Sequence, residues 1–180
     1  MQGTDIDFKL ATSPGAANED CTVESAFDTL LVRCVEELVT LGPRASGAAA
    51  VANTGEHLSP QEFHAALRSA SEGEVVLLDA RNIYESRIGH FSAPAAETVL
   101  PGTRCFSDLS RWLDSQEAAL RGKRVLMYCT GGVRCERASA YLREKGAGFE
   151  NVLQLSGACF LTSTLSHTIA CMQTGRRCLP

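Results

Sequence analysis

The 180-residue sequence has no long hydrophobic run, few aromatic residues and no excess of positive charge. No apolar stretch approaches the roughly 18 residues that cross a bilayer, and Asp5 and Asp7 stand where a signal peptide carries basic residues. Aromatic residues make up 6%, so we expect a mainly aliphatic core. A net charge of −4 excludes a uniformly basic surface of the kind that traps nucleic acid, although a local basic patch is compatible with it. We expect a cytoplasmic protein without a membrane partner.

The eight cysteines form no C-x-x-C pair, and the four histidines do not stand at zinc-finger spacing from them. The sequence therefore predicts no metal site. Without an export signal, reduced thiols are a better expectation than a disulfide framework. This directs attention to the reactivity of one thiol.

The chain divides into three parts. Residues 1–56 form a partly irregular N-terminal region, in which the apolar segment 29–41 predicts one or two short strands and the small-residue segment 43–55 predicts a linker. Residues 57–157 have the patterning of a folded domain. Residues 158–180 form a tail with spacing suited to a short closing helix, and its three cysteines have no assigned role.

Strands and helices alternate within the central part. Ser59 and Glu62 form a capping box with Pro60 at the first helical position, so a helix is predicted to start at 60. A continuous apolar run predicts a buried strand that Asp79 closes. The remaining predictions are strands at 124–128 and 152–155, helices around 109–113 and at 134–145 with Gly146 as the cap, and an irregular segment at 80–106. This alternation predicts an α/β fold with a mostly parallel sheet and helices on both faces.

The most informative segment joins the strand at 124–128 to the helix at 134–145. It places Cys129 at the carboxyl end of a strand, where open α/β sheets bind ligands. The following residues are Thr130, Gly131, Gly132, Val133 and Arg134. Two glycines allow the backbone N–H groups to converge on one anion, and the helix N-terminus adds its positive end. With Arg134 and Arg137 nearby, we expect an acidic thiol at Cys129 rather than a buried structural cysteine.

The length of this loop distinguishes sulfur transfer from phosphate hydrolysis. Cys129 and Arg134 enclose a C-x4-R ring, whereas the cradle of cysteine-dependent phosphatases is C-x5-R, and position +6 here is Cys135. The smaller ring suits a sulfur atom. The thiolate is predicted to attack the outer sulfur of a donor and to hold the product as a persulfide, with residues 130–134 binding the substrate.

These motifs resemble the rhodanese family over about residues 57–157. The resemblance rests on D-x-R at 79–81, GHF at 89–91, the loop at 129–134 and LSG at 155–157. Within this family, the segment CTGGVRCERASAYL is similar to the corresponding sequence of the rhodanese-domain tRNA uridine hydroxylases. The resemblance implies five parallel strands flanked by helices, catalysis by Cys129, and a remnant of a small α/β domain within 1–56. The tail departs from the family pattern after Gly157.

Neighbouring residues receive separate interpretations. Asp79 and Arg81 are expected to form a structural ion pair rather than an acid and base. Glu85 and His90 lie in the next loop, where a preformed thiolate needs no general base, and His90 is interpreted as structural. Cys135 is a candidate resolving thiol for Cys129 and equally a small packing residue.

Three functions follow from these observations. The first is a sulfurtransferase that uses Cys129 and a small donor such as thiosulfate or a persulfide, without a cofactor. The second is a tRNA uridine 5-hydroxylase-like protein, for which the basic residues of the helix at 134–145 would meet tRNA phosphates. The third is a non-catalytic rhodanese-like binding module. The sequence does not specify an oligomeric state.

Overall fold

The computed structural model describes residues 39–42 and 53–157. Five strands form one sheet in the order β1-β5-β4-β2-β3, and every pairing between neighbours is parallel. The strands are β1 (Glu56–Leu58), β2 (Val75–Asp79), β3 (Glu97–Val99), β4 (Arg124–Tyr128) and β5 (Val152–Leu155). The helices are α1 (Pro60–Arg68), α2 (Ile83–Ser86), the 3₁₀ helix η3 (Phe106–Asp108), α3 (Leu109–Ser115), α4 (Glu117–Leu120) and α5 (Val133–Glu144). The predicted α/β class with a five-stranded parallel sheet is confirmed.

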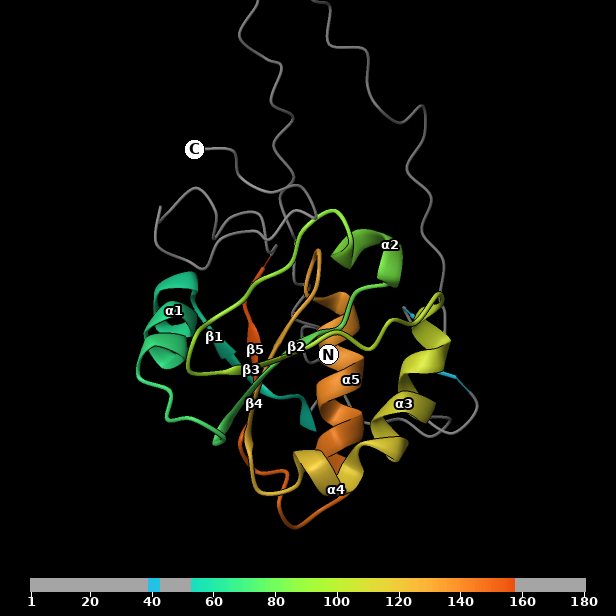
Figure 1. The fold of residues 1–180 in the computed structure, drawn as a ribbon. Coiled ribbons are helices and arrows are strands. Elements are labelled where there is room, and N and C mark those ends of the chain that lie inside the picture. The colour runs from blue at the N-terminus through green and yellow to red at the C-terminus, as the bar shows by residue number, and fades with distance from the viewer. Residues whose placement is uncertain (1–38, 43–52, 158–180) are drawn as a thin grey trace, which may run out of the picture. The chain divides into compact units, whose positions relative to one another are not determined.

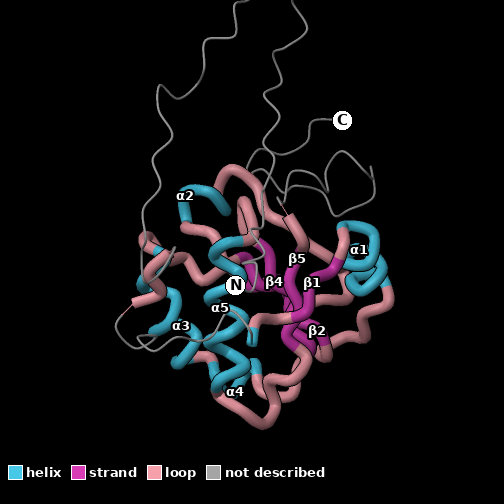
Figure 2. The backbone as a smooth tube through the Cα atoms, turned by 180° about the vertical axis from the view of Figure 1, so that it is seen from behind, coloured by secondary structure: helices cyan, strands magenta, loops and turns pink. Residues whose placement is uncertain are grey.

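Helices cover both faces of the sheet. In Figures 1 and 2, α1 lies on one side of the strands and α3, α4 and α5 lie on the other. Successive residues of β2 alternate between these layers: Val76 and Leu78 belong to the apolar cluster with α3 and α5, whereas Val75 and Leu77 pack with α1. All four are buried, which explains why the strand reads as a continuous apolar run in the sequence.

The start of α1 follows the predicted local chemistry. The Ser59 hydroxyl accepts the Glu62 N–H at 3.3 Å, and the Glu62 carboxylate accepts the Ser59 N–H at 2.8 Å. The capping box thus satisfies two backbone donors at the helix start. Phe63 and Leu67 are buried on the face turned to the sheet, which anchors α1 there.

Five short elements were not predicted, namely the strands β1 and β3, the helices α2 and α4, and the 3₁₀ helix η3. The strands β1 and β3 have three residues each, and α2 has four, within segments that the sequence left irregular or treated as a helix lead-in. Such lengths are too short to develop a periodic pattern. The other predicted strands, the helix at 109–113 and the helix at 134–145 appear within a few residues of their expected bounds.

Several expectations lie wholly or mainly outside the described residues. These are most of the strand segment 29–41, the linker through residue 52 and the tail at 158–180. Leu41 is described, and it is fully buried in the same apolar cluster as α3 and α5. Among the residues that the structure describes, no helix has the length and apolarity needed to cross a membrane.

Candidate active site

Cys129 follows β4 at its carboxyl end and precedes α5. The alternation of β4 places Val125, Met127 and Cys129 on the α5 face, while Tyr128 points to the α1 face. Cys129 is 2% exposed, and it shares its cluster with the fully buried Cys135 from the first turn of α5. The position that the sequence predicted therefore places two thiols in one apolar layer.

The loop backbone turns inward on the thiol at Gly132. The Gly132 N–H donates to the Cys129 Sγ at 3.0 Å. Gly132 has a φ of +85°, in the left-handed region where a side chain is strained, and it forms the N-cap of α5. Gly131 has no positive φ. Of the two adjacent glycines, only Gly132 is required by the backbone conformation.

The surroundings of Cys129 stabilise its thiolate. A hydrogen bond from the Cys135 thiol is the largest influence that lowers the pKa of Cys129 to about 6, against the opposing effect of burial. Backbone N–H groups of Cys135 and Gly131 and the charge of Arg134 act in the same direction. Burial, together with the hydrogen bond to Cys129, raises the pKa of Cys135 well above its ordinary value. Both shifts favour the negative charge on Cys129, with Cys135 as the thiol that donates to it.

Arg134 makes its main contacts with Glu85 at the rim of the loop. Arg134 Nη1 donates to Glu85 Oε2 at 2.6 Å and Nη2 donates to Oε1 at 2.7 Å. The Thr130 hydroxyl donates to Glu85 Oε1 at 2.6 Å and accepts from Arg134 Nη2 at 2.8 Å. These bonds, led by the one from Arg134, lower the pKa of Glu85 to about 2. The loop arginine is thus held by an ionised carboxylate from α2.

The importance of Glu85 was not recognised from the sequence. Its carboxylate also accepts the Asn82 N–H at 3.2 Å, so a capping pattern locates it at the start of α2. That local signal gives no information about a partner 49 residues away in the chain. An acidic residue in the loop after β2 was visible, but its contact with Arg134 depends on how β2 and β4 pair.

A second ion pair lies behind the loop, on the α1 face of the sheet. Asp79 is fully buried and accepts three bonds from Arg81: from the backbone N–H at 3.0 Å, from Nε at 2.8 Å and from Nη2 at 2.6 Å. The Tyr128 hydroxyl donates to Asp79 Oδ2 at 2.8 Å and accepts the Phe91 N–H at 3.0 Å. Arg81 Nη2 also donates to the Gly89 carbonyl at 2.7 Å. The D-x-R and GHF segments therefore meet at the residue before Cys129.

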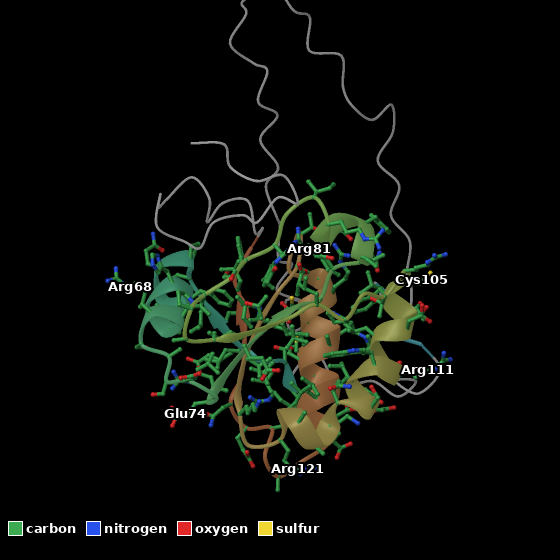
Figure 3. The ribbon with its side chains drawn as sticks, in the orientation of Figure 1. Arg68, Glu74, Arg81, Cys105, Arg111 and Arg121 are labelled. Atoms are coloured by element: carbon green, nitrogen blue, oxygen red, sulfur yellow. The ribbon has the colours of Figure 1, made fainter. Side chains whose placement is uncertain are left out.

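Figure 3 shows Arg81 of this pair toward the end of the sheet at which β4 leads into Cys129. Arg81 is labelled close to α2, whereas Glu74, just before β2, and Arg121 are labelled at the opposite end. His90 lies next to Phe91 in the sequence, and its Nδ1 is 3.1 Å from the Ser86 carbonyl oxygen. The predicted ion-pair residues are thus joined to each other and, through the Tyr128 hydroxyl, to the end of β4.

Three of the four basic residues that the sequence offered for phosphate contact lie close to groups of the domain itself or are buried in it. Arg134 is held by Glu85, and Arg137 is buried. Lys145 is bound by Asp114 at 2.6 Å and by Glu117 at 3.1 Å. The fourth basic residue, Arg143, donates to the side-chain oxygen of Asn53 and to the Glu150 carbonyl, both at 3.3 Å. Contact of these residues with phosphates stays a prediction. No group of three or more His, Cys, Asp or Glu side chains within 39–42 and 53–157 is arranged to hold a metal ion.

Comparison with known proteins matches residues 59–160 to the family described as Rhodanese-like domain. The chain is 50% identical over 162 residues to "Rhodanese-like domain-containing protein 6" of Arabidopsis thaliana, covering 87% of this chain and 28% of that protein. It is 40% identical over 132 residues to "tRNA uridine(34) hydroxylase" of Bacillus velezensis, covering 73% of this chain and 38% of that protein. The chain thus spans less than half the length of these curated relatives.

A solved rhodanese-related protein from Thermoplasma volcanium is also similar. It has 16% identity and a TM-score of 0.45, with 64% of this chain and 97% of that chain covered.

Proposed function

Because the chain belongs to the rhodanese-like domain family, we propose that it transfers sulfane sulfur through a persulfide on Cys129. The Cys129 thiolate attacks the outer sulfur of a donor, a new S–S bond forms, and the donor's S–S bond breaks with release of sulfite or a thiolate. An acceptor thiolate then attacks the terminal sulfur of the persulfide, and Cys129 leaves again as a thiolate. Both steps conserve electrons without a cofactor.

The observation that carries this proposal is the hydrogen bonding around the Cys129 Sγ. A Gly132 N–H at 3.0 Å and a pKa of about 6 favour a nucleophile that is ionised at neutral pH. The same donors would face the inner sulfur of a persulfide. Thr130, Gly131, Val133 and Arg134 are proposed to surround the transferred atom, because they form the loop after the thiol and the first two residues of α5.

Intact-mass measurement tests this function. Incubation with sulfane-sulfur donors of different charge is expected to add one sulfur, about 32 Da, to Cys129 with at least one of them. The Cys129→Ser variant should remain folded and gain no sulfur at this site, and the Cys105→Ser variant, which removes an exposed thiol, should still gain it. An unchanged mass with both thiosulfate, which would release sulfite, and a neutral alkyl hydropersulfide, which would release an alkyl thiolate, would refute the proposal.

A second candidate is modification of a tRNA uridine, which the names of relatives such as that of Bacillus velezensis favour. The chain covers 38% of that relative, so the part of the relative that meets tRNA need not be the part that this chain matches. Within the domain, Arg134 is paired with Glu85 and Lys145 with Asp114.

The second candidate is tested with tRNA lacking the modification. Hydroxylation of uridine that depends on Cys129, detected by nucleoside mass spectrometry, would establish it. A salt-sensitive gel shift would show tRNA binding by this chain alone. Sulfur transfer to Cys129 without any tRNA binding at low salt would favour the first candidate for this chain.

A further inference from the structure

Two charged side chains, Glu85 and Arg134, form an ion pair beside the Cys129 loop, and the Thr130 hydroxyl bonds to both. Glu85 receives both Nη groups of Arg134, at 2.6 and 2.7 Å, and the two side chains are only 22% and 17% exposed. The Thr130 hydroxyl fixes the same carboxylate from the loop side at 2.6 Å. A carboxylate held by two parallel bonds and a third donor is geometrically well defined.

This arrangement changes what the loop arginine does for an incoming substrate. A guanidinium presents a planar fork of N–H groups that suits the oxygens of sulfate-like or phosphate-like anions. Here Glu85 takes bonds from both Nη atoms, and its charge balances that of Arg134. The charge of the Cys129 thiolate is then left over. The side chains of Glu85, Arg134 and Cys129 together therefore present one net negative charge to an approaching dianion, although the loop contains an arginine.

We propose that Glu85 is a specificity-determining residue that disfavours small dianions, so that the Cys129 loop receives sulfur from donors with little or no negative charge. This proposal names the donor class of the proposed sulfur transfer and rests on that function. The proposal distinguishes between thiosulfate and a persulfide, the two donors suggested by the sequence. Thiosulfate, a dianion, is expected to be a poor donor, whereas a neutral alkyl hydropersulfide, which gives up its outer sulfur and leaves as a thiolate, is expected to be a good one.

The charge preference can be measured with paired thiol reagents. Methyl methanethiosulfonate is neutral, and its 2-sulfonatoethyl analogue carries one negative charge. Each reacts with the thiolate to form a mixed disulfide and releases methanesulfinate, so the bond changes are the same. Peptide-level mass spectrometry follows Cys129 separately from the other cysteines. The ratio of the anionic to the neutral rate reports charge and cancels any change in thiolate fraction.

The decisive comparison uses Glu85→Gln, which keeps the size and the hydrogen-bonding oxygen but removes the charge. We expect the anionic-to-neutral ratio to rise by about fivefold, because one unit charge within several ångströms is removed from a partly shielded site. The matched control is Glu97→Gln, whose carboxylate pairs with Lys123 at 2.9 Å, toward the other end of the sheet. It removes the same charge and should leave the ratio unchanged. A Glu85→Gln ratio equal to that of wild type would overturn the proposal.

The wild-type protein provides a test that does not depend on a folded variant. Salt screens repulsion, so the anionic rate should increase between low and moderate salt while the neutral rate stays constant. An anionic rate that falls with salt would overturn the proposal. The anionic-to-neutral rate ratio tests only the role of Glu85. The mass gain of Cys129 with sulfur donors tests only sulfur transfer. Failure of one is therefore distinguishable from failure of the other.

Discussion

Two networks in this domain have the same chemical composition, a carboxylate, a guanidinium and a hydroxyl group. The inner network consists of Asp79, Arg81 and Tyr128, and the outer network consists of Glu85, Arg134 and Thr130. The inner carboxylate is fully buried, whereas the outer one is partly exposed at the rim of the cysteine loop. Cys129 separates them in the chain, since Tyr128 precedes it and Thr130 follows it.

The difference in burial gives the two networks different consequences. A buried carboxylate depends on its partners, so removal of one leaves an uncompensated charge and lowers the free energy of unfolding. A partly exposed ion pair contributes little to stability because water solvates its members. The inner network is therefore expected to hold the end of β4 in place, and the outer network to set the charge that a substrate meets.

The largest expected effect is that of Asp79→Asn. Loss of the charge leaves the nearly buried Arg81 guanidinium without its anion, so the free energy of unfolding should fall by about 3–5 kcal/mol. Glu85→Gln is the matched change in the outer network, and it should cost less than about 1 kcal/mol. Urea unfolding followed by circular dichroism measures both. Equal losses would show that burial does not separate the two networks.

Tyr128→Phe should have the next largest effect. It removes the donor to Asp79 and leaves the buried Phe91 N–H without its acceptor, which should cost about 2 kcal/mol in the free energy of unfolding. The Cys129 alkylation profile of the folded variant should be unchanged, because the Tyr128 side chain lies on the other face of the sheet. A shifted profile would contradict the assignment of the inner network to stability alone.

Cys135 is an exception to this comparison, because it is a buried residue that is expected to affect the reactivity of Cys129. Its thiol is wholly buried, yet its hydrogen bond is the largest influence that lowers the pKa of Cys129 to about 6. Wild-type alkylation should therefore increase as pH rises through about 6 and then level off. Cys135→Ala should move this rise to higher pH and slow alkylation at pH 6 by roughly tenfold, which is the effect of about one hydrogen bond to a charged group.

Cys135→Ser provides the control, because a hydroxyl group still donates to the thiolate. Its profile should lie nearer to that of wild type. The lowered pKa of Cys129 also affects stability. The thiolate stabilises the folded state fully at a pH above the pKa of the thiol in the unfolded chain, and this stabilisation is lost as the pH falls toward about 6, the pKa in the folded state. If neither variant shifts the profile, Cys135 is a packing residue only. A wild-type pKa near the free-thiol value would favour the non-catalytic module.

The sequence predicted local features better than contacts between distant segments. The capping box at Ser59, the buried run of β2 and the strand–cysteine–helix segment are encoded by neighbouring residues, and the structure contains all three. The contact of Glu85 with Arg134 joins residues 49 apart, and it exists because β2 and β4 are adjacent in the sheet. The roles of the site residues remain predictions, and the experiments above address them.

Substitution of Thr130 should have the smallest effect on stability and on the reagent ratio. It tests which group of the outer network positions the Glu85 carboxylate. Thr130→Val keeps the shape but removes the hydroxyl that donates to Glu85 at 2.6 Å and accepts from Arg134 at 2.8 Å. Because the side chain is exposed at the rim, the free energy of unfolding should change by less than about 0.5 kcal/mol. The anionic-to-neutral reagent ratio should change by less than about twofold, since the carboxylate keeps both bonds to Arg134. Thr130→Ser should match wild type. A Thr130→Val ratio as high as that of Glu85→Gln would mean that the hydroxyl positions the carboxylate, and that Arg134 alone does not.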